Sequence, residues 1–245
     1  MRNEVVWLLF IIFDLSTALL AIRLYGKVAL YAIVIVNIIL CNLQVLKLVE
    51  LFGFTMTLGN IAYGSVFMAT DLLVECYGKN EARKAINLSF YALVFVTVSL
   101  QFTINYTPSA HDINHPAMLQ LFQCIPRVTL ASLVAYMLSQ YHDVWAFSWW
   151  KQKTNGKHLW LRNNASTIIS QLIDSTIFTF IAFYGVYELS IVWSIFYTTL
   201  IIKWIVAVLD TPSVYIGRWL LQRKIAEDKV NELCHKNNSL IATNL

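Results

Sequence analysis

The stretch Ala165–Tyr187, ASTIISQLIDSTIFTFIAFYGVY, decides the fold class. It is apolar, contains no proline, and is long enough to cross the hydrocarbon core of a bilayer as a helix, which takes about 20 residues. One acidic residue, Asp174, lies near its centre. The stretch therefore predicts a membrane-spanning helix with a carboxylate inside the bilayer.

The composition of the whole chain agrees with this prediction. Of the 245 residues, 58% are hydrophobic and only 13% are charged, whereas a soluble domain carries about 25% charged residues. A soluble globular domain and a disordered chain are both excluded. The net charge of +4 without a basic run argues against a nucleic-acid partner. The four cysteines are far apart and form no CxxC pair, so we expect no metal or other cofactor.

Six further apolar stretches follow one another along the chain, separated by glycines, prolines, amides or charges. We therefore predict an all-α integral membrane protein with seven spans. The predicted spans are Val5–Leu24, Val28–Leu51, Thr57–Tyr77, Ile86–Tyr106, Met118–Tyr141, Ala165–Tyr187 and Ser190–Leu209.

The basic residues predict the orientation. With the N-terminus outside, 14 of the 18 Lys and Arg residues fall on the cytoplasmic side; Arg2 and Lys47 lie outside, and Arg127 and Lys203 lie within spans. The positive-inside rule then predicts an outside N-terminus and a cytoplasmic C-terminus. We divide the chain into an N-terminal transmembrane helix (1–27), a six-helix core (28–217) and a polar, partly helical cytoplasmic tail (218–245).

Ionisable side chains within the spans are the strongest functional signal. Each costs about 3 kcal/mol in lipid, so they must face the bundle interior and be paired or hydrated. Matching depths on opposite-running helices predict two ion pairs, Arg127 with Asp174 and Lys203 with Asp71. The remaining embedded acids are Asp14, Asp210 and, near the cytoplasmic end, Glu75.

One face of the sixth predicted span carries Thr167, Gln171, Asp174 and Phe178 at positions i, i+4, i+7 and i+11. A hydroxyl, an amide, a carboxylate and an aromatic ring on one face suit a small planar polar solute, although an amide alone more often joins helices. Polar stripes on other spans favour a central cavity: Asn37, Cys41 and Gln44; Asp71 and Glu75; Lys203 and Asp210.

Enzyme signatures are weak. Ser65 lacks the second glycine of a GxSxG motif. His111 and His115 fall in an external loop with two prolines, so they do not form an HExxH helix. An intramembrane enzyme or a helix-packing scaffold remains the alternative class, and we expect no catalytic residue.

Three segments in order along the chain each contain an embedded ionisable residue. They are TDLLVECYGKNEARKA (Thr70–Ala85), RVTLASLVAY (Arg127–Tyr136) followed by Ser139 and Gln140, and LWLRNNAST (Leu159–Thr167) continuing through Gln171–Ser175. Together they resemble the queuosine precursor transporter family, also called the vitamin uptake transporter family, over roughly Asn37–Tyr215.

The resemblance implies a six-helix core like that of the substrate-binding subunits of energy-coupling-factor vitamin importers, with the first helix as an addition. It implies import across the bacterial inner membrane of 7-deazaguanines (7-cyano-7-deazaguanine, 7-aminomethyl-7-deazaguanine or queuine) for the queuosine of tRNA. The implied partners are the small-molecule base and the lipid bilayer; a homodimer and an energising module are compatible with it.

A deazaguanine ring has a donor edge that suits a carboxylate and a carbonyl edge that suits an arginine or an amide. We expect Asp174 or Asp71 at the donor edge. At the carbonyl edge we expect Gln171, Asn163 or Arg127.

The flat faces of the ring suit an aromatic platform, Phe178 or Trp160. Glu75 is either a cytoplasmic gate or a proton site, and Thr167 and Lys203 complete the candidate binding residues.

Two mechanisms follow from these candidates. The first is a self-sufficient carrier, either a facilitator or proton-coupled through Asp71, Glu75 or Asp174. The second is a substrate-binding subunit that depends on a separate ATPase module, since the chain contains no GxxxxGK[ST] motif of its own. A carrier of another nucleobase or vitamin is a further alternative.

Overall fold

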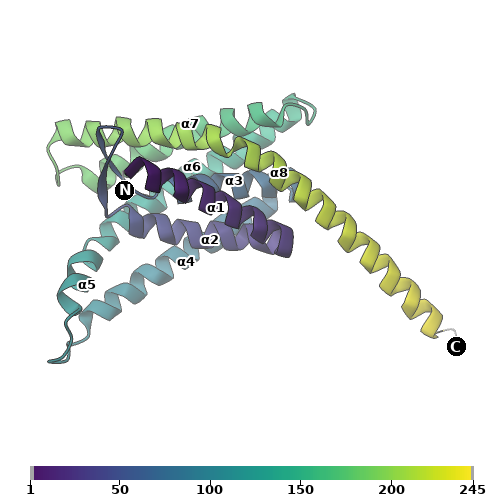
Figure 1. Cartoon of the computed structure of the whole chain (residues 1–245), viewed down its shortest axis with the longest axis horizontal. Helices are drawn as coiled ribbons and strands as arrows, with labels where there is room; N and C mark the ends of the chain where they lie inside the picture. The colour runs from purple at the N-terminus through teal and green to yellow at the C-terminus, as the bar shows by residue number, and fades with distance from the viewer. Residues whose placement is uncertain (1–2, 244–245) are drawn as a thin grey trace.

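The computed structural model describes the chain over residues 3–243, with side chains over residues 3–54 and 56–227. Helices pack side by side in a bundle, and one end of the bundle carries a small antiparallel hairpin (Figure 1). The elements are α1 (Asn3–Tyr25), α2 (Lys27–Gln44), β1 (Leu48–Leu51), β2 (Phe54–Thr57), α3 (Asn60–Tyr77), α4 (Lys79–Asn105), α5 (His115–Phe122), α6 (Ile125–Lys153), α7 (Leu159–Phe183) and α8 (Leu189–Thr243).

Six helical stretches of the described chain are long and apolar enough to cross a membrane. This finding confirms the predicted α-helical, multi-pass membrane protein. The stretches are Asn3–Tyr25, Lys27–Gln44, Lys79–Asn105, His115–Lys153, Leu159–Phe183 and Leu189–Glu227.

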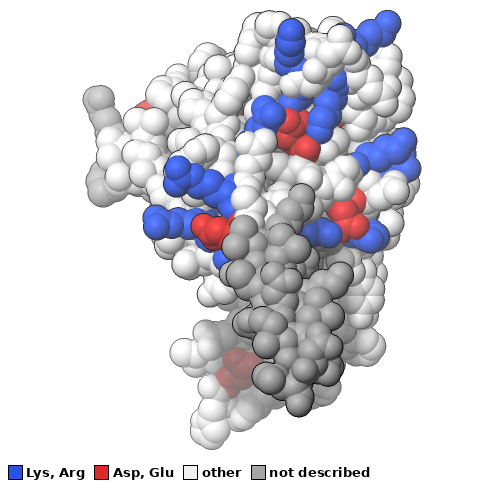
Figure 2. Space-filling view, turned by 90° about the vertical axis from the view of Figure 1, so that its right-hand side faces the viewer, with Lys and Arg blue, Asp and Glu red and all other residues white. Residues whose placement is uncertain are grey.

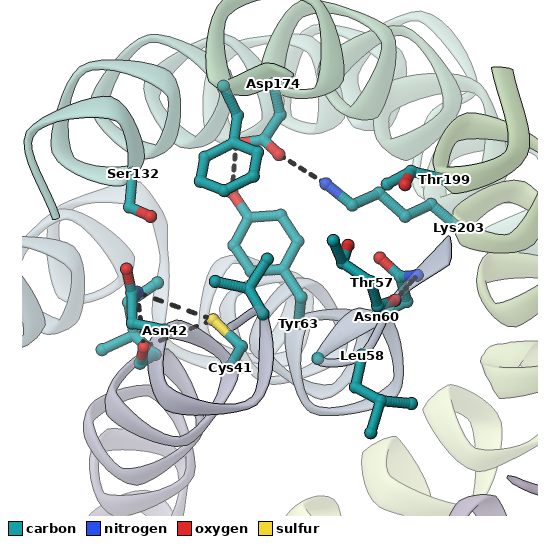
Figure 3. Close-up of a pocket in the computed structure, with 14 residues that line it drawn as sticks. Cys41, Asn42, Thr57, Leu58, Asn60, Tyr63, Ser132, Asp174, Thr199 and Lys203 are labelled. Carbon is teal, nitrogen blue, oxygen red and sulfur yellow. Dashed lines mark hydrogen bonds and ion pairs between the residues drawn. The ribbon is translucent and has the colours of Figure 1, made fainter. Parts of the chain in front are cut away.

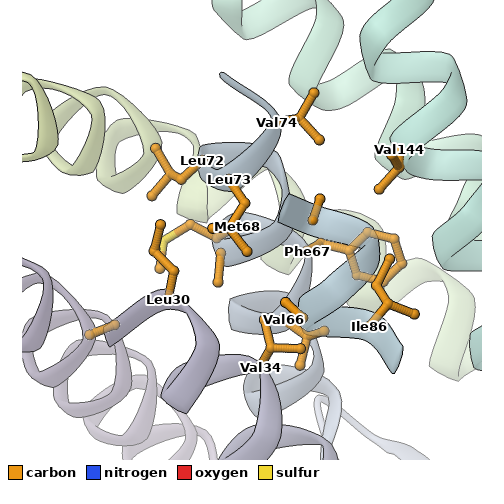
Figure 4. Close-up of a cluster of buried hydrophobic side chains, with 14 of the residues drawn as sticks. Leu30, Val34, Val66, Phe67, Met68, Leu72, Leu73, Val74, Ile86 and Val144 are labelled. Carbon is orange, nitrogen blue, oxygen red and sulfur yellow. The ribbon is translucent and has the colours of Figure 1, made fainter. Parts of the chain in front are cut away.

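Helix α3, predicted as the third of seven spans, is not among these six, because its 18 residues include Asn60, Asp71 and Glu75 and it contains no longer apolar stretch. It is buried from Asn60 to Val74 and packs against α1, α2, α4, α6 and α8. Its apolar side chains, such as Phe67 and Leu73, meet those of α2 and α4 in the main core cluster (Figure 4). Since other helices surround α3, it carries polar side chains without exposing them to lipid.

The second predicted span is too long. Helix α2 ends at Gln44, and the apolar residues up to Leu51 belong instead to the hairpin, in which Leu48 pairs with Thr57 and Leu51 with Phe54. The turn residues Phe52 and Gly53 both have positive φ angles, as two-residue hairpin turns require. The short run Leu48–Leu51 is therefore a strand, although its apolar residues predicted the end of a helix.

Two other helices are longer than their predicted spans. Helix α6 extends to Lys153, well past Tyr141. Helix α8 continues through Pro212 into the C-terminal tail, which projects from the bundle in Figure 1. Two glycines allow α8 to pack closely on α3: a Cβ at Gly64 or at Gly217 would lie within 2.7 Å of a side chain of the other helix.

Candidate functional site

A pocket with several polar side chains in its lining lies inside the bundle near the hairpin. Five helices and the segment that follows β2 contribute its walls (Figure 3). Its lining residues are Ile38, Cys41 and Asn42 of α2, Val45 directly after α2, Thr57 of β2, Leu58 and Gly59, Asn60 and Tyr63 of α3, Ser132 of α6, Asp174 and Phe178 of α7, and Thr199 and Lys203 of α8.

The carboxylate of Asp174 is the focus of the pocket. The ammonium of Lys203 lies 2.6 Å from Asp174 Oδ2. The hydroxyl of Tyr63 donates a hydrogen bond of 2.5 Å to Asp174 Oδ1, and Ser139 donates another of 3.3 Å. All four residues are buried, so the carboxylate is held by one cation and two hydroxyls in a site of low polarity.

Packing between helices positions these groups. Helices α7 and α8 pack side by side, which brings Lys203 to Asp174. The same ammonium lies 4.6 Å from the centre of the Tyr63 ring, at cation–π distance. Lys203 is therefore held by the Asp174 carboxylate and by the Tyr63 ring. Tyr63 in turn contacts both Asp174 and Lys203.

Other lining groups offer unused polar atoms. Asn42 Oδ1 and Thr199 Oγ1 are buried and have no hydrogen-bond partner among the described residues. The Phe178 ring provides an apolar wall beside them. A ligand with donor groups and a flat face would satisfy these atoms and cover the ring.

Glycine is required at the rim of the pocket. Gly59 has a φ of +100°, and a Cβ there would lie 2.8 Å from the backbone oxygen of Cys41. Only glycine allows α2 and the start of α3 to approach this closely. The cavity volume is about 40 Å³, which holds a few water molecules but not a bicyclic base.

Three of the ten predicted binding residues come together in this pocket: Asp174, Phe178 and Lys203. Gln171 and Thr167 lie on the same helix as Asp174, one and two turns further from the hairpin, and are buried. They do not line the pocket, and the same is true of buried Asn163. Trp160 lies at the start of α7 with 53% of its surface exposed, far along the helix from Phe178.

The predicted pair of Arg127 with Asp174 is wrong. The Arg127 guanidinium is exposed and donates hydrogen bonds to the backbone oxygens of Ile181 (3.1 Å) and Tyr184 (2.5 Å). These oxygens belong to the C-terminal end of α7 and lack helical partners, so the arginine caps the helix and complements its dipole.

The predicted pair of Lys203 with Asp71 is also wrong, because Lys203 is bound to Asp174. Asp71 lies deeper in the bundle, and neither of its carboxylate oxygens has a hydrogen-bond partner among the described residues. Asp143 of α6, which the sequence analysis overlooked, lies beside it.

Glu75, one turn further along α3, joins four helices. Its carboxylate meets Arg162 Nη2 of α7 at 2.5 Å, Lys151 Nζ of α6 at 3.0 Å and Arg218 Nε of α8 at 3.2 Å. The Arg162 side chain is completely buried. This network closes the end of the bundle that lies opposite the hairpin.

Sequence reasoning missed Tyr63, Asn42, Asn60 and Asp143. Asn42 lies next to Cys41, which the polar stripe on α2 already singled out. Asp143 lies one turn after Ser139, but the predicted span stopped at Tyr141. Tyr63 gave no signal, because a tyrosine in an apolar stretch is usually a packing residue.

A bundle of long apolar helices around a buried, charged pocket defines a multi-pass membrane protein with a small-molecule site, the architecture of a transporter. Comparison with known proteins specifies the family. Residues 57–217 match the family model described as "Putative vitamin uptake transporter", and the chain belongs to this family.

Two relatives are named for the same cargo. The chain is 40% identical over 222 residues to the "Probable queuosine precursor transporter" of Bacillus subtilis (strain 168), covering 90% of this chain and 97% of the relative. It is 32% identical over 139 residues to the "Queuosine precursor transporter" of Escherichia coli (strain K12), covering 56% and 59%. Both are named transporters, a non-enzymatic role. No solved structure matches this chain.

Proposed function

We propose that this protein imports a queuosine precursor, a 7-deazaguanine base, across the bacterial inner membrane by alternating access. The observation that carries the proposal is the buried Asp174 carboxylate, held by Lys203 and Tyr63 in a pocket between five helices. The names of the two relatives support the choice of cargo.

The chemistry of the pocket fits this base. The Asp174 carboxylate accepts hydrogen bonds from the ring N–H and the exocyclic amine, and the Lys203 ammonium donates to the carbonyl. Phe178 stacks on a face of the ring. Since the cavity of about 40 Å³ is too small for the base, binding must widen it, as alternating access requires.

The base enters from the hairpin side in this proposal. A second cavity, beneath the hairpin and beside α1, shares the lining segment Thr57–Asn60 with the pocket. The hairpin and Asn60 therefore separate an outer vestibule from the binding site. Widening at this segment admits the base.

The opposite end of the bundle is cytoplasmic in this proposal. Lys and Arg side chains gather there around a few acidic groups (Figure 2), and the positive-inside rule assigns such an end to the cytoplasm. With α3 counted as a crossing helix, the chain spans the membrane seven times and its N-terminus is outside. The Glu75 network with Lys151, Arg162 and Arg218 is then the closed inner gate.

Uptake in cells tests the function. A strain that can neither make nor import queuosine precursors should regain queuosine in its tRNA when it expresses this protein and receives 7-cyano-7-deazaguanine. Asp174→Asn should abolish the gain, whereas Glu188→Gln, which alters an exposed carboxylate, should preserve it. Unmodified tRNA in cells with membrane-inserted wild-type protein would refute the proposal.

Whether the chain forms a homodimer or binds a separate energising module stays a prediction. We propose that the chain acts without an ATPase subunit, because the inner gate is built from its own side chains. The mass of the purified protein in detergent, measured with and without candidate subunits, checks both points. The six-helix core like that of energy-coupling-factor subunits is likewise a prediction.

A further inference from the structure

A cluster of three acids lies between the binding pocket and the Glu75 network. Asp71 of α3, Asp143 of α6 and Asp210 of α8 are each at least 97% buried. Asp71 and Asp143 face each other within hydrogen-bond reach, and Asp210 lies within electrostatic range of both. Three helices thus bring three like charges to one point inside the bundle.

The cluster has no neutralising partner. Among the described side chains, no lysine or arginine lies at ion-pair distance from Asp71, Asp143 or Asp210, although the structure contains six ion pairs elsewhere. The Arg162 guanidinium of α7 acts on Asp71 electrostatically, but it is bound to Glu75.

The oxygens of Asp71 lack donors in the described chain, whereas the hydroxyls of Ser166, Thr167 and Ser170 on α7 lie near Asp143. Both oxygens of Asp71, both of Asp143 and one of Asp210 have no hydrogen-bond partner among the described residues. Two facing carboxylates cannot donate to each other, but a proton shared between them supplies the missing donor. Like charges this close in an apolar interior do not both ionise.

A further group points to a bound ligand at this place. The Thr167 hydroxyl of α7 is 98% buried, has no hydrogen-bond partner and faces Asp143. No group of three or more His, Cys, Asp or Glu residues in the described chain has the geometry of a metal site. A proton between Asp71 and Asp143 would satisfy the oxygens that the α7 hydroxyls leave unpartnered.

We propose that Asp71 and Asp143 share a transported proton and that Asp210 and Thr167 complete its binding site, which makes the carrier a proton symporter. This inference rests on the proposed function and identifies the proton gradient as the driving force for uptake of the base. A proton enters from outside with the base, binds the carboxylate pair, and leaves to the cytoplasm when the inner gate opens. Glu75 and Asp174 do not serve as this site, because each is neutralised by bound cations.

Polar side chains connect the two sites. On α6, Ser139 contacts Asp174 and lies one turn from Asp143. On α7, Gln171 and Thr167 lie between Asp174 and the acid cluster and are buried with unpartnered oxygens. Adjacent turns of α6 and α7 therefore connect the base at Asp174 with the proton site.

Transport by purified protein in lipid vesicles tests the proposal. The cargo is labelled 7-cyano-7-deazaguanine, whose charge does not change near neutral pH. With the outside one pH unit more acidic, wild-type protein should concentrate the base up to about tenfold, the limit for one proton per base. A protonophore should remove this accumulation, and an internal pH dye should report acidification on addition of the base.

Two variants distinguish the loss of proton coupling from the loss of base transport. Asp143→Asn should retain exchange of labelled for unlabelled base and lose accumulation, whereas the exposed Glu188→Gln should retain both. If Asp143→Asn does not fold, the same measurements are made on Asp71→Asn, and the internal pH dye reports proton entry with the wild-type protein. Wild-type exchange without gradient-driven accumulation, or accumulation by a folded Asp143→Asn protein, would overturn the proton site alone. Absence of wild-type exchange would overturn the proposed function as well.

Discussion

Lys203 of α8 and Asp174 of α7 form a buried ion pair with 2.6 Å between Nζ and Oδ2. Both groups line the pocket, together with Thr199 of α8. The Tyr63 hydroxyl and ring contact the two partners from α3. The pair and Tyr63 thus join three helices at the pocket.

Replacement of Lys203 by Met should destabilise the protein by about 3–5 kcal/mol, because it leaves the Asp174 carboxylate buried without a cation. The double variant Asp174→Asn with Lys203→Met should recover most of that stability and still fail to bind the base. Thermal unfolding in detergent and a binding titration measure the two effects. A double variant that binds normally would show the pair to be structural.

Replacement of Tyr63 by Phe should weaken binding of the base about tenfold. The ring and its contact with Lys203 remain, but Asp174 loses one hydroxyl donor, and such a bond to a charged group contributes about 1.5 kcal/mol. Tyr91→Phe on α4, where the side chain is 67% exposed, is the matched control. Equal affinities of the two variants would show that the Tyr63 hydroxyl does not contribute to binding of the base.

Replacement of Phe178 by Leu should weaken binding by about 1–3 kcal/mol, the range of stacking between a base and an aromatic ring. Trp160→Leu should leave the affinity unchanged, since this side chain lies outside the pocket and is half exposed. The same titration distinguishes the two predicted platforms. A larger loss with Trp160→Leu would assign stacking to Trp160 instead.

Replacement of Glu75 by Gln should lower the unfolding free energy by about 3–5 kcal/mol, because the buried Arg162 loses its carboxylate. Glu81→Gln, which loses surface pairs with Lys27 and Lys84, should cost less than about 1 kcal/mol. The double variant Glu75→Gln with Arg162→Met should recover stability. Similar melting temperatures for the two single variants would argue against a closed inner gate.

Hydropathy predicted the positions of the helices well, but it did not predict which helices pack against one another. The embedded charges at Asp174 and Lys203 were recognised, yet each was paired with the wrong residue. Depth along the membrane normal follows from position in a span, whereas the sideways contacts of α7 with α8 depend on packing. For the same reason Arg127, at a plausible depth, turned out to cap the end of α7.

Errors at the ends of helices had larger consequences. Leu48–Leu51 is as apolar as a membrane segment, but its strand pairing and the turn at Phe52 and Gly53 take it out of α2. The predicted span that stopped at Tyr141 concealed Asp143, because α6 continues as a helix to Lys153. The acid cluster forms only when α6 and α8 pack against α3, which the positions of the spans do not predict.

Exchange of base by the purified protein tests the central claim most directly. Vesicles that contain only this protein and unlabelled 7-cyano-7-deazaguanine should take up the labelled base by counterflow, and Asp174→Asn should reduce the initial rate at least tenfold. The matched Glu188→Gln protein should exchange at the wild-type rate. Counterflow no faster than in protein-free vesicles, or an undiminished rate with Asp174→Asn, would contradict the account.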